Sequence, residues 1–345
     1  MTLAFPRLPS LDDVLEGAVP FRVALNVNFR GVTERTGLLL SGPAGWGEFA
    51  PFADYDDVGA AAWLAAAVEA AWLGWPEPVR DVVAVNGIIP DVPVNECVAI
   101  ARAAVDRGVR TLKLKVAGAQ RSAVDDLVRL QAVRDAVGDG VRLRIDANGG
   151  WSVEQALEIL EAIGGLSLEY VEQPCATLDE CAVVKASEIA PVAVDEGLRR
   201  AAAVEDARLH DKIRASGDIV ILKSAPLGGV RRALRIAQSL DMPTVVSGAM
   251  DTSVGLAAGV ALAAALPPPH FAAGLGTGAL LETDVVHEIR LPRRGMLPVG
   301  AVAPDAAELH AATAKVTDAE ADELRARLAR AWDAGAMQLL ESVLS

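Results

Sequence analysis

The chain has 345 residues, 52% of them hydrophobic, and its 46 acidic and 32 basic side chains give a net charge of −14. This length suits about two domains, or one barrel with an attachment, and it can bury a large core without disulfides. The charge argues against nucleic acid or an anionic membrane surface as the main partner, and no stretch of about 18 residues is free of charges and breakers.

The three cysteines are Cys97, Cys175 and Cys181, an odd number with no CxxC pair. That usage fits a reducing compartment better than secretion. The first residues also lack the layout of a signal peptide. We therefore expect a cytoplasmic protein without a membrane partner.

Residues 1–80 read as the first part of a separate α+β domain. Short apolar runs punctuated by Gly and Pro predict a small antiparallel sheet at residues 21–30, 37–42 and 45–48. The Ala-rich segment 57–73 that follows is helical in pattern.

From residue 81 to residue 280 short strand-like runs alternate with longer amphipathic segments. The predicted strands are 82–85, 111–116, 141–147, 168–172, 192–194, 219–223, 243–246 and 271–273. The predicted helices are 94–107, 122–137, 153–163, 201–214, 230–240 and 254–266, with Ser152 and Ser253 as N-caps. Eight such units predict a closed parallel barrel, and the lack of a Gly-rich fingerprint after the first strand disfavours a dinucleotide-binding fold.

The alternation stops after the barrel. Residues 284–302 look extended again, and residues 317–343 have the pattern of one long charged helix. We expect segment 281–345 to return to the N-terminal part and complete that domain.

Charged side chains stand at the ends of the predicted barrel strands. Lys113 and Lys115 alternate with apolar residues and so share one face of their strand. Arg144, Asp146 and Asn148 share a face of the next strand, together with Arg142 one layer deeper. Arg142 suits a structural ion pair, whereas Arg144 fits a structural or a functional role.

The residues Lys115, Asp146, Glu172, Asp195, Lys223 and Ser247 follow one another at intervals of roughly one βα unit. Each residue therefore falls at the C-terminal end of a successive strand, the face on which barrel enzymes keep their active sites. Three carboxylates converging there require a cation, and oxygen ligands without His or Cys favour Mg²⁺. A lysine beside such a site can act as a base that removes a proton next to a carboxylate.

Each of these signals has an ordinary explanation when it is taken alone. A Lys-x-Lys strand is usually a solvated edge, and a strand-terminal Asp or Glu is more often a helix cap or a salt-bridge partner. The functional interpretation depends on six such residues being in phase with the βα repeat on one rim.

Taken in order, these motifs resemble the enolase superfamily, in its muconate lactonizing enzyme-like subgroup. The matching segments are Lys113-Leu-Lys115, Asp146-Ala-Asn148, Glu172-Gln-Pro174, Asp195-Glu196 and Lys223, and the segment 45–51 is similar to the capping-domain signature. The resemblance implies a modified (β/α)7β barrel of the TIM type, with an α+β capping domain formed from the N-terminal region and the C-terminal tail.

The resemblance also implies the roles of single residues. Asp146, Glu172 and Asp195 would bind Mg²⁺, for which Mn²⁺ can substitute. Lys115 would be the catalytic acid/base, and Lys113 would support its lowered pKa. Lys223, also catalytic, would stand on the opposite face, as a second base in racemases or as a cation that stabilises the enediolate in dehydratases. Substrate contacts are expected at residues in or beside these motifs, namely Asn148, Arg144, Ser224, Ser247, Gly248 and Met250.

Within the subgroup, the segments 223–229 and 247–253 most resemble the actinobacterial o-succinylbenzoate synthases. The resemblance implies a lyase that dehydrates 2-succinyl-6-hydroxy-2,4-cyclohexadiene-1-carboxylate to 2-succinylbenzoate in menaquinone synthesis. Lys115 would remove the proton alpha to the ring carboxylate, giving an enediolate that the metal stabilises. The alternative is an N-succinylamino acid racemase or another racemase or cycloisomerase of the subgroup, and the chain is expected to be a monomer or a homo-oligomer.

Overall fold

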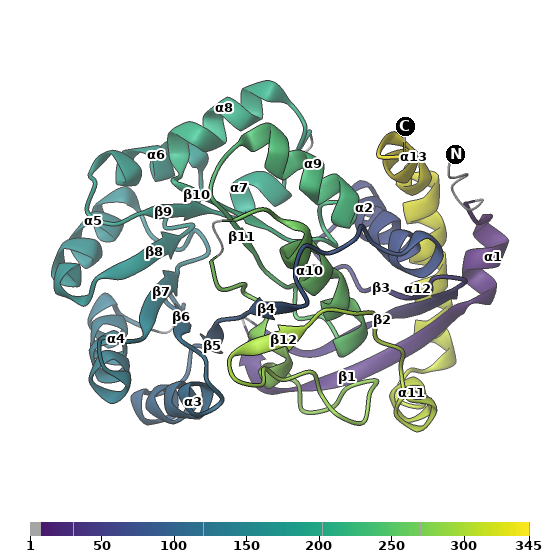
Figure 1. Cartoon of the computed structure of the whole chain (residues 1–345), viewed down its shortest axis with the longest axis horizontal. Helices are drawn as coiled ribbons and strands as arrows, with labels where there is room; N and C mark the ends of the chain where they lie inside the picture. The colour runs from purple at the N-terminus through teal and green to yellow at the C-terminus, as the bar shows by residue number, and fades with distance from the viewer. Residues whose placement is uncertain (1–7, 30, 120, 202, 269–270, 345) are drawn as a thin grey trace.

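The computed structural model describes residues 8–29, 31–119, 121–201, 203–268 and 271–344. These residues form a barrel of alternating strands and helices and, beside it, an α+β capping domain (Figure 1). Across the same residues, no helix combines the length and the apolar run that a membrane crossing requires.

The barrel sheet has seven parallel strands in the order β11-β10-β9-β8-β7-β6-β5. Their bounds are β5 (Gly87–Ile89), β6 (Thr111–Lys115), β7 (Arg142–Asp146), β8 (Leu168–Glu172), β9 (Val192–Val194), β10 (Ile219–Leu222) and β11 (Thr244–Val246). The ring is closed by single bridges from Ala273 to Val85 and from Gly274 to Ser247. This curled parallel sheet with its capping domain confirms the predicted fold class.

The predicted eighth strand, 271–273, is thus reduced to the closing bridge at Ala273. The predicted first strand, 82–85, belongs to the barrel only at its last residue, Val85, which makes the closing bridge to Ala273. Its core, β4 (Val82–Ala84), pairs antiparallel with β12 (Met296–Pro298), and β5 instead lies beside β6. β4 buries only its middle residue, as suits a two-stranded ladder, whereas a barrel strand is covered on both faces. Within 284–302, predicted to be extended, only β12 is a strand.

Helices pack around the outside of the sheet. They are α3 (Val94–Asp106), α4 (Ala123–Val137), α5 (Val153–Ala162), α6 (Leu178–Ala186), α7 (Glu196–Arg199), α8 (Ala207–Ser216), α9 (Val230–Leu240) and α10 (Ser253–Ala265), with a short 3₁₀ turn, η2 (Gly164–Leu166), after α5 and another, η3 (Gly276–Leu280), after the closing bridge. Ser152 caps α5 as predicted, whereas Thr252, not Ser253, caps α10. The sequence patterns missed α6, whose apolar residues are not confined to one face, and began α8 too early.

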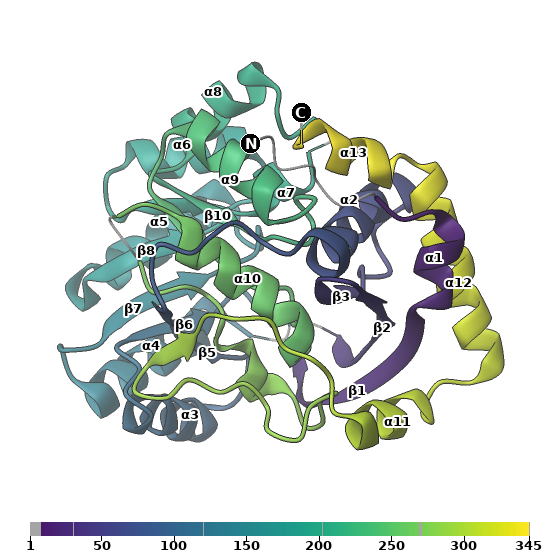
Figure 2. The same cartoon turned by 45° about the vertical axis from the view of Figure 1, so that its right-hand side comes forward.

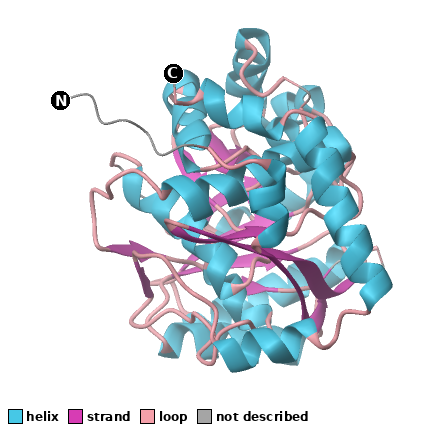
Figure 3. Cartoon of the chain, turned by 90° about the vertical axis from the view of Figure 1, so that its right-hand side faces the viewer, coloured by secondary structure: helices cyan, strands magenta, loops and turns pink. Residues whose placement is uncertain are grey.

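The capping domain combines the first described residues with the last. It contains α1 (Leu11–Glu16), β1 (Ala18–Phe29), β2 (Val32–Gly42), β3 (Gly45–Phe49), α2 (Asp57–Val68) with the π turn η1 (Glu69–Leu73), α11 (Ala306–Thr313), α12 (Asp318–Asp333) and α13 (Ala336–Ser342). The three strands form an antiparallel sheet, drawn with the other strands in magenta in Figure 3. The helices α12 and α13 lie beside α2 (Figure 2), and side chains of the three helices form one apolar cluster. The predicted single helix 317–343 is two helices, because Gly335, with a φ of 106°, lies at the break.

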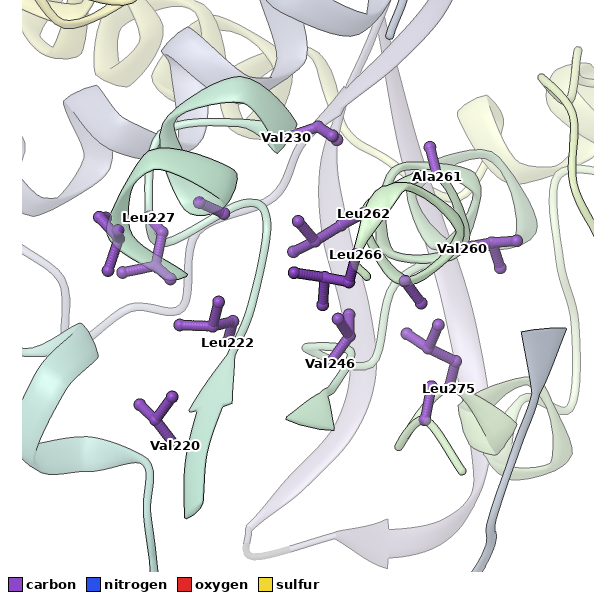
Figure 4. Close-up of a cluster of buried hydrophobic side chains, with 14 of the residues drawn as sticks. Val220, Leu222, Leu227, Val230, Val246, Val260, Ala261, Leu262, Leu266 and Leu275 are labelled. Atoms are coloured by element: carbon purple, nitrogen blue, oxygen red, sulfur yellow. The ribbon is translucent and has the colours of Figure 1, made fainter. Parts of the chain in front are cut away.

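The largest apolar cluster of the barrel lies between the strands and the outer helices. Figure 4 shows part of it, where Leu222 of β10 and Val246 of β11 lie near Leu262 of α10 and Leu266, the residue that follows this helix. Fully burying one such side chain contributes roughly 1.5–3 kcal/mol. A smaller cluster that includes Tyr170 and Ile221 is formed by alternate residues of the same strands. The apolar faces therefore hold the strands in place, and the charged residues occupy the strand ends.

Candidate active site

Three carboxylates end or follow three neighbouring strands of the barrel. Asp146 is the last residue of β7, Glu172 is the last residue of β8, and Asp195 directly follows β9. At most 1% of each residue is exposed. Parallel strands present their carboxyl ends at one edge of the sheet. The spacing of about one βα unit between the three carboxylates therefore brings them to one rim.

The three predicted lysines contact these carboxylates. Lys113 Nζ donates to both oxygens of Glu172 at 2.9 and 3.0 Å and lies 3.1 Å from Asp146 Oδ2. Lys115 Nζ donates to Asp146 Oδ2 at 2.5 Å and to Asn148 Oδ1 at 2.9 Å. On the other side, Lys223 Nζ donates to Asp195 Oδ2 at 2.7 Å. Because β6 and β10 lie four positions apart in the ring, Lys115 and Lys223 face the site from opposite sides.

Burial and charge shift the pKa values of these groups in different directions. Burial lowers the pKa of Lys115, and neighbouring Lys113 adds to this effect, although Asp146 opposes it. For Lys113, burial is outweighed by Glu172 and Asp146, which raise its pKa. Burial and the charge of Asp146 raise the pKa of Glu172 to about 7. For Asp146 itself, burial is outweighed by Lys115 and Lys113, which lower its pKa.

A cavity of about 570 Å³ lies above these residues, between the barrel mouth and the capping domain. The barrel side includes Lys113, Lys115 and Lys223. The capping side is largely aromatic and contributes Phe29, Phe52, Tyr55 and Trp63. The Phe29 ring lies 5.2 Å from Lys115 Nζ, so the capping domain covers one lysine directly.

Four of the six residues expected to contact substrate border this cavity: Asn148, Ser247, Gly248 and Met250. Arg144 and Ser224 do not. The fully buried Arg144 donates to Glu169 Oε2 at 2.5 Å and to Asn86 Oδ1 at 2.9 Å, and its guanidinium lies over the Tyr170 ring. Ser224 lies at a small separate cavity near Glu48.

Strained backbone supports the rim where strands turn into loops. Asn148, Gln173 and Met250 have positive φ angles of 47°, 39° and 58°, a region that non-glycine residues seldom occupy. Gln173 Oε1 accepts from the backbone N–H groups of Asp195, at 3.0 Å, and Gly197, at 3.3 Å. Gln173 therefore holds the loop that carries the third carboxylate.

The sequence patterns missed several residues of the cavity. Arg199 and Arg200 follow Asp195-Glu196 closely, so their place in the chain was a usable signal. The aromatic residues Phe29 and Tyr55 offered no such signal, because the capping domain reaches the site only through tertiary packing.

The donor set of the rim suits a hard divalent cation, since three buried carboxylates from adjacent strands supply only oxygen ligands. Glu196 Oε2, beside Asp195, is also buried, with no hydrogen-bond partner among the described residues. In that same part of the chain, no group of three or more His, Cys, Asp and Glu side chains is arranged to hold a metal as it stands. In this structure the lysine ammonium groups contact carboxylate oxygens of the same donor set.

Comparison with known proteins gives matches over most of the chain. Residues 96–336 match the family model described as enolase C-terminal domain-like, and residues 20–71 match the enolase N-terminal domain-like family. The o-succinylbenzoate synthase of Thermobifida fusca is 47% identical over 313 residues, which cover 91% of this chain and 96% of that protein. The o-succinylbenzoate synthase of Mycolicibacterium smegmatis is 45% identical, over 89% of this chain and 93% of that protein.

Solved structures share the fold at lower identity. The muconate lactonizing enzyme from Pseudomonas fluorescens, complexed with muconolactone, matches with a TM-score of 0.73 and 19% identity over 86% of this chain and 97% of that one. The L-Ala-D/L-Glu epimerase from Bacillus subtilis, in a substrate-liganded complex, matches with a TM-score of 0.70 and 22% identity over 83% and 96%. At these identities the likeness concerns the fold alone.

Proposed function

The chain belongs to the enolase superfamily, within the family of the o-succinylbenzoate synthases, and on this premise we propose that it dehydrates 2-succinyl-6-hydroxy-2,4-cyclohexadiene-1-carboxylate to 2-succinylbenzoate. This is a lyase reaction and a step of menaquinone synthesis. The observation that carries the proposal is a pair of lysines that face a capped cavity from opposite sides, above three buried carboxylates.

Lys115 is the proposed base. Its lowered pKa favours a neutral amine, which can remove the proton alpha to the ring carboxylate. The same nitrogen, now protonated, then donates to the ring hydroxyl as that group leaves as water. The electron pair released at the alpha carbon forms the new ring double bond, and the product is aromatic. Lys113 stays a cation beside Lys115 and helps to keep the pKa of Lys115 low.

We assign Asp146, Glu172 and Asp195 to the divalent cation that the superfamily uses, Mg²⁺ with Mn²⁺ as a substitute. When bound, the cation supplies positive charge where the substrate carboxylate gains negative charge. The three carboxylates would hold it, and Asn148, bonded to Lys115, keeps that amine beside them.

Lys223 is proposed to act as a fixed cation on the face opposite Lys115. Its bond to Asp195 holds it at the rim, where its charge stabilises the enediolate that forms when the proton leaves. Asn148, Ser247, Gly248 and Met250 are the proposed substrate contacts, because they border the cavity. We assign Arg144 and Ser224 to the support of its walls.

Incubation with the cyclohexadiene substrate and Mg²⁺ tests the proposal. The diene absorbance should disappear as 2-succinylbenzoate forms, at a rate proportional to enzyme concentration. Persistence of the diene absorbance would refute the assignment.

The alternative, an N-succinylamino acid racemase, is favoured by one observation: Lys115 and Lys223 could exchange protons on the two faces of a substrate carbon. Deuterium incorporated from D₂O at the alpha carbon of an N-succinylamino acid would support racemisation. In the absence of such exchange, dehydration would remain the only proposed activity.

The proposal extends to cellular context and domain limits. We propose a cytoplasmic enzyme, monomeric or homo-oligomeric, that binds neither nucleic acid nor membrane, in line with the net charge of −14. We propose domain limits at residues 1–80 and 281–345 for the capping domain and 81–280 for the barrel. Sedimentation would give the oligomeric state.

A further inference from the structure

Arg199 joins the charged rim of the barrel to the capping domain. It is the last residue of α7, its side chain is 12% exposed, and it borders the cavity. Its Nε donates to Asp195 Oδ1 at 3.0 Å, and its Nη2 donates to Glu196 Oε1 at 2.7 Å. The remaining nitrogen, Nη1, donates to Tyr55 Oη at 2.8 Å. The guanidinium therefore holds two barrel carboxylates and one capping-domain hydroxyl at once.

Tyr55 is fixed in the capping domain by its ring. It lies between β3 and α2, and its ring makes an edge contact with Trp63 at a centroid distance of 5.6 Å. The position of its hydroxyl therefore depends on how the capping domain is seated on the barrel.

The contacts of Arg199 continue to both lysines of the proposed reaction. Asp195 accepts from Lys223 at 2.7 Å through its other oxygen. Glu196 Oε1 also accepts from Asn148 Nδ2 at 3.2 Å, and Asn148 Oδ1 accepts from Lys115 Nζ at 2.9 Å. Two hydrogen-bonded routes thus lead from one guanidinium to amines on opposite sides of the cavity.

We propose that Arg199 is a positioning residue that does not contact the reacting atoms. Through its hydrogen bonds, the position of Tyr55 in the capping domain determines the positions of Lys115 and Lys223. The inference rests on the proposed function only for the roles of the two lysines. A guanidinium suits this task because its planar donors point in fixed directions, whereas a lysine presents one freely rotating ammonium. Burial strengthens each bond of such a network.

The test compares steady-state kinetics of Tyr55→Phe, Arg199→Lys and the double variant. Tyr55→Phe keeps the ring against Trp63 and removes only the hydroxyl. It should lower kcat about tenfold, which is at the low end of the loss seen when a residue that hydrogen-bonds to a catalytic group is changed. It should change KM by less than about twofold. In the Arg199→Lys background the same change should have little further effect, because the hydroxyl has already lost its partner.

Two results would overturn the proposal. An effect of Tyr55→Phe on KM alone would mean that the hydroxyl binds substrate directly. Multiplicative losses in the double variant would mean that the two residues act independently. Arg330→Gln is the matched control, because Arg330 pairs with Asp57 and Glu323 on the exposed surface of the capping domain, and its kcat should equal that of the wild type.

A double-mutant cycle on the stability of these variants needs neither substrate nor metal. The free energies of unfolding of the same variants, measured in urea on the metal-free protein, should be non-additive if the Tyr55–Arg199 bond forms. Wild-type protein that fails to dehydrate the diene would refute the proposed function but leave this cycle intact. Additive free energies would refute the network, whatever the activity.

Discussion

Two lysines of one strand, two residues apart, differ in the charge state that their surroundings favour. Lys113 lies against two carboxylates, Glu172 and Asp146, and their attraction holds its pKa above the ordinary value. Lys115 is also buried, and its burial, with the neighbouring charge of Lys113, outweighs the attraction of Asp146 and lowers its pKa. The pattern separates a permanent cation from an amine able to accept a proton, which is the division of roles that acid–base catalysis requires.

Lys115→Ala should reduce dehydration by at least about 10³-fold, because general base catalysis contributes about 10²–10⁴-fold and the same amine also protonates the leaving group. Mg²⁺ affinity, measured by calorimetry, should stay near that of the wild type, since the carboxylates are unchanged. Lys212→Ala, which removes an exposed partner of Asp179, is the matched control. Retained activity in Lys115→Ala would contradict the assignment of the base.

Removal of divalent metal should abolish turnover. The rim holds three buried carboxylates, and substrate adds a further negative charge, so the enediolate lacks sufficient compensation without a cation. Treatment with a chelator followed by addition of Mg²⁺ or Mn²⁺ should restore the rate, as followed by the diene absorbance. Full activity in the chelated protein would show that the lysines alone suffice.

At the scale of elements, the capping sheet and its helix approach so closely that only glycine fits between them. A Cβ atom on Gly47 of β3 would lie 2.0 Å from the backbone oxygen of Ala67 in α2. No flexible side chain is available to move aside, because the contact is with backbone. This contact sets how near α2, which carries Trp63 of the cavity wall, lies to the sheet.

Gly47→Ala should therefore lower the free energy of unfolding by about 1–3 kcal/mol or more, the usual cost of overpacking a core. Gly140→Ala provides the comparison, because a Cβ atom on Gly140 would have no neighbour within 4 Å and its φ is not left-handed. That variant should change stability by less than about 1 kcal/mol. Urea unfolding monitored by circular dichroism distinguishes the two, and equal stabilities would contradict the close contact.

At the scale of the whole molecule, a buried polar cluster joins the capping domain to the barrel. Glu48 of β3 accepts from the backbone and hydroxyl of Thr252, the N-cap of α10, at 3.0 and 2.5 Å. Arg35 of β2 donates to the backbone oxygen of Met250, which borders the cavity. Burial, followed by repulsion from Asp251, raises the pKa of Glu48 to about 8, while Arg35 opposes the rise.

This shift predicts that stability falls as pH rises. Between the ordinary pKa of 4.5 and the folded value of about 8, the folded chain retains a proton that the unfolded chain has released. The free energy of unfolding should therefore decline through this range and level off above it. Asp251, whose pKa is also raised by burial, contributes in the same direction.

Urea unfolding of the wild type and of Glu48→Gln between about pH 5.5 and pH 8.5 measures the effect. The variant keeps a neutral hydrogen-bonding group at this position and should show a flatter dependence on pH. Parallel curves for the two proteins would mean that Glu48 does not carry the buried proton.

The sequence alone determined the βα repeat, the faces of the strands and the alignment of Lys115, Asp146, Glu172, Asp195 and Lys223 on one rim. These features follow from local periodicity. Alternation along a strand sets the face on which each side chain lies, and the length of one βα unit brings successive strand ends to one rim. The roles assigned to these residues remain predictions until the variants are measured.

Only the tertiary structure decided which strand lies beside β6, how Ala273 and Gly274 close the ring, and which capping residues reach the site. The contact of Tyr55 with Arg199 joins positions 144 residues apart. No local pattern encodes such a pair, because its formation depends on how the capping domain packs on the finished barrel.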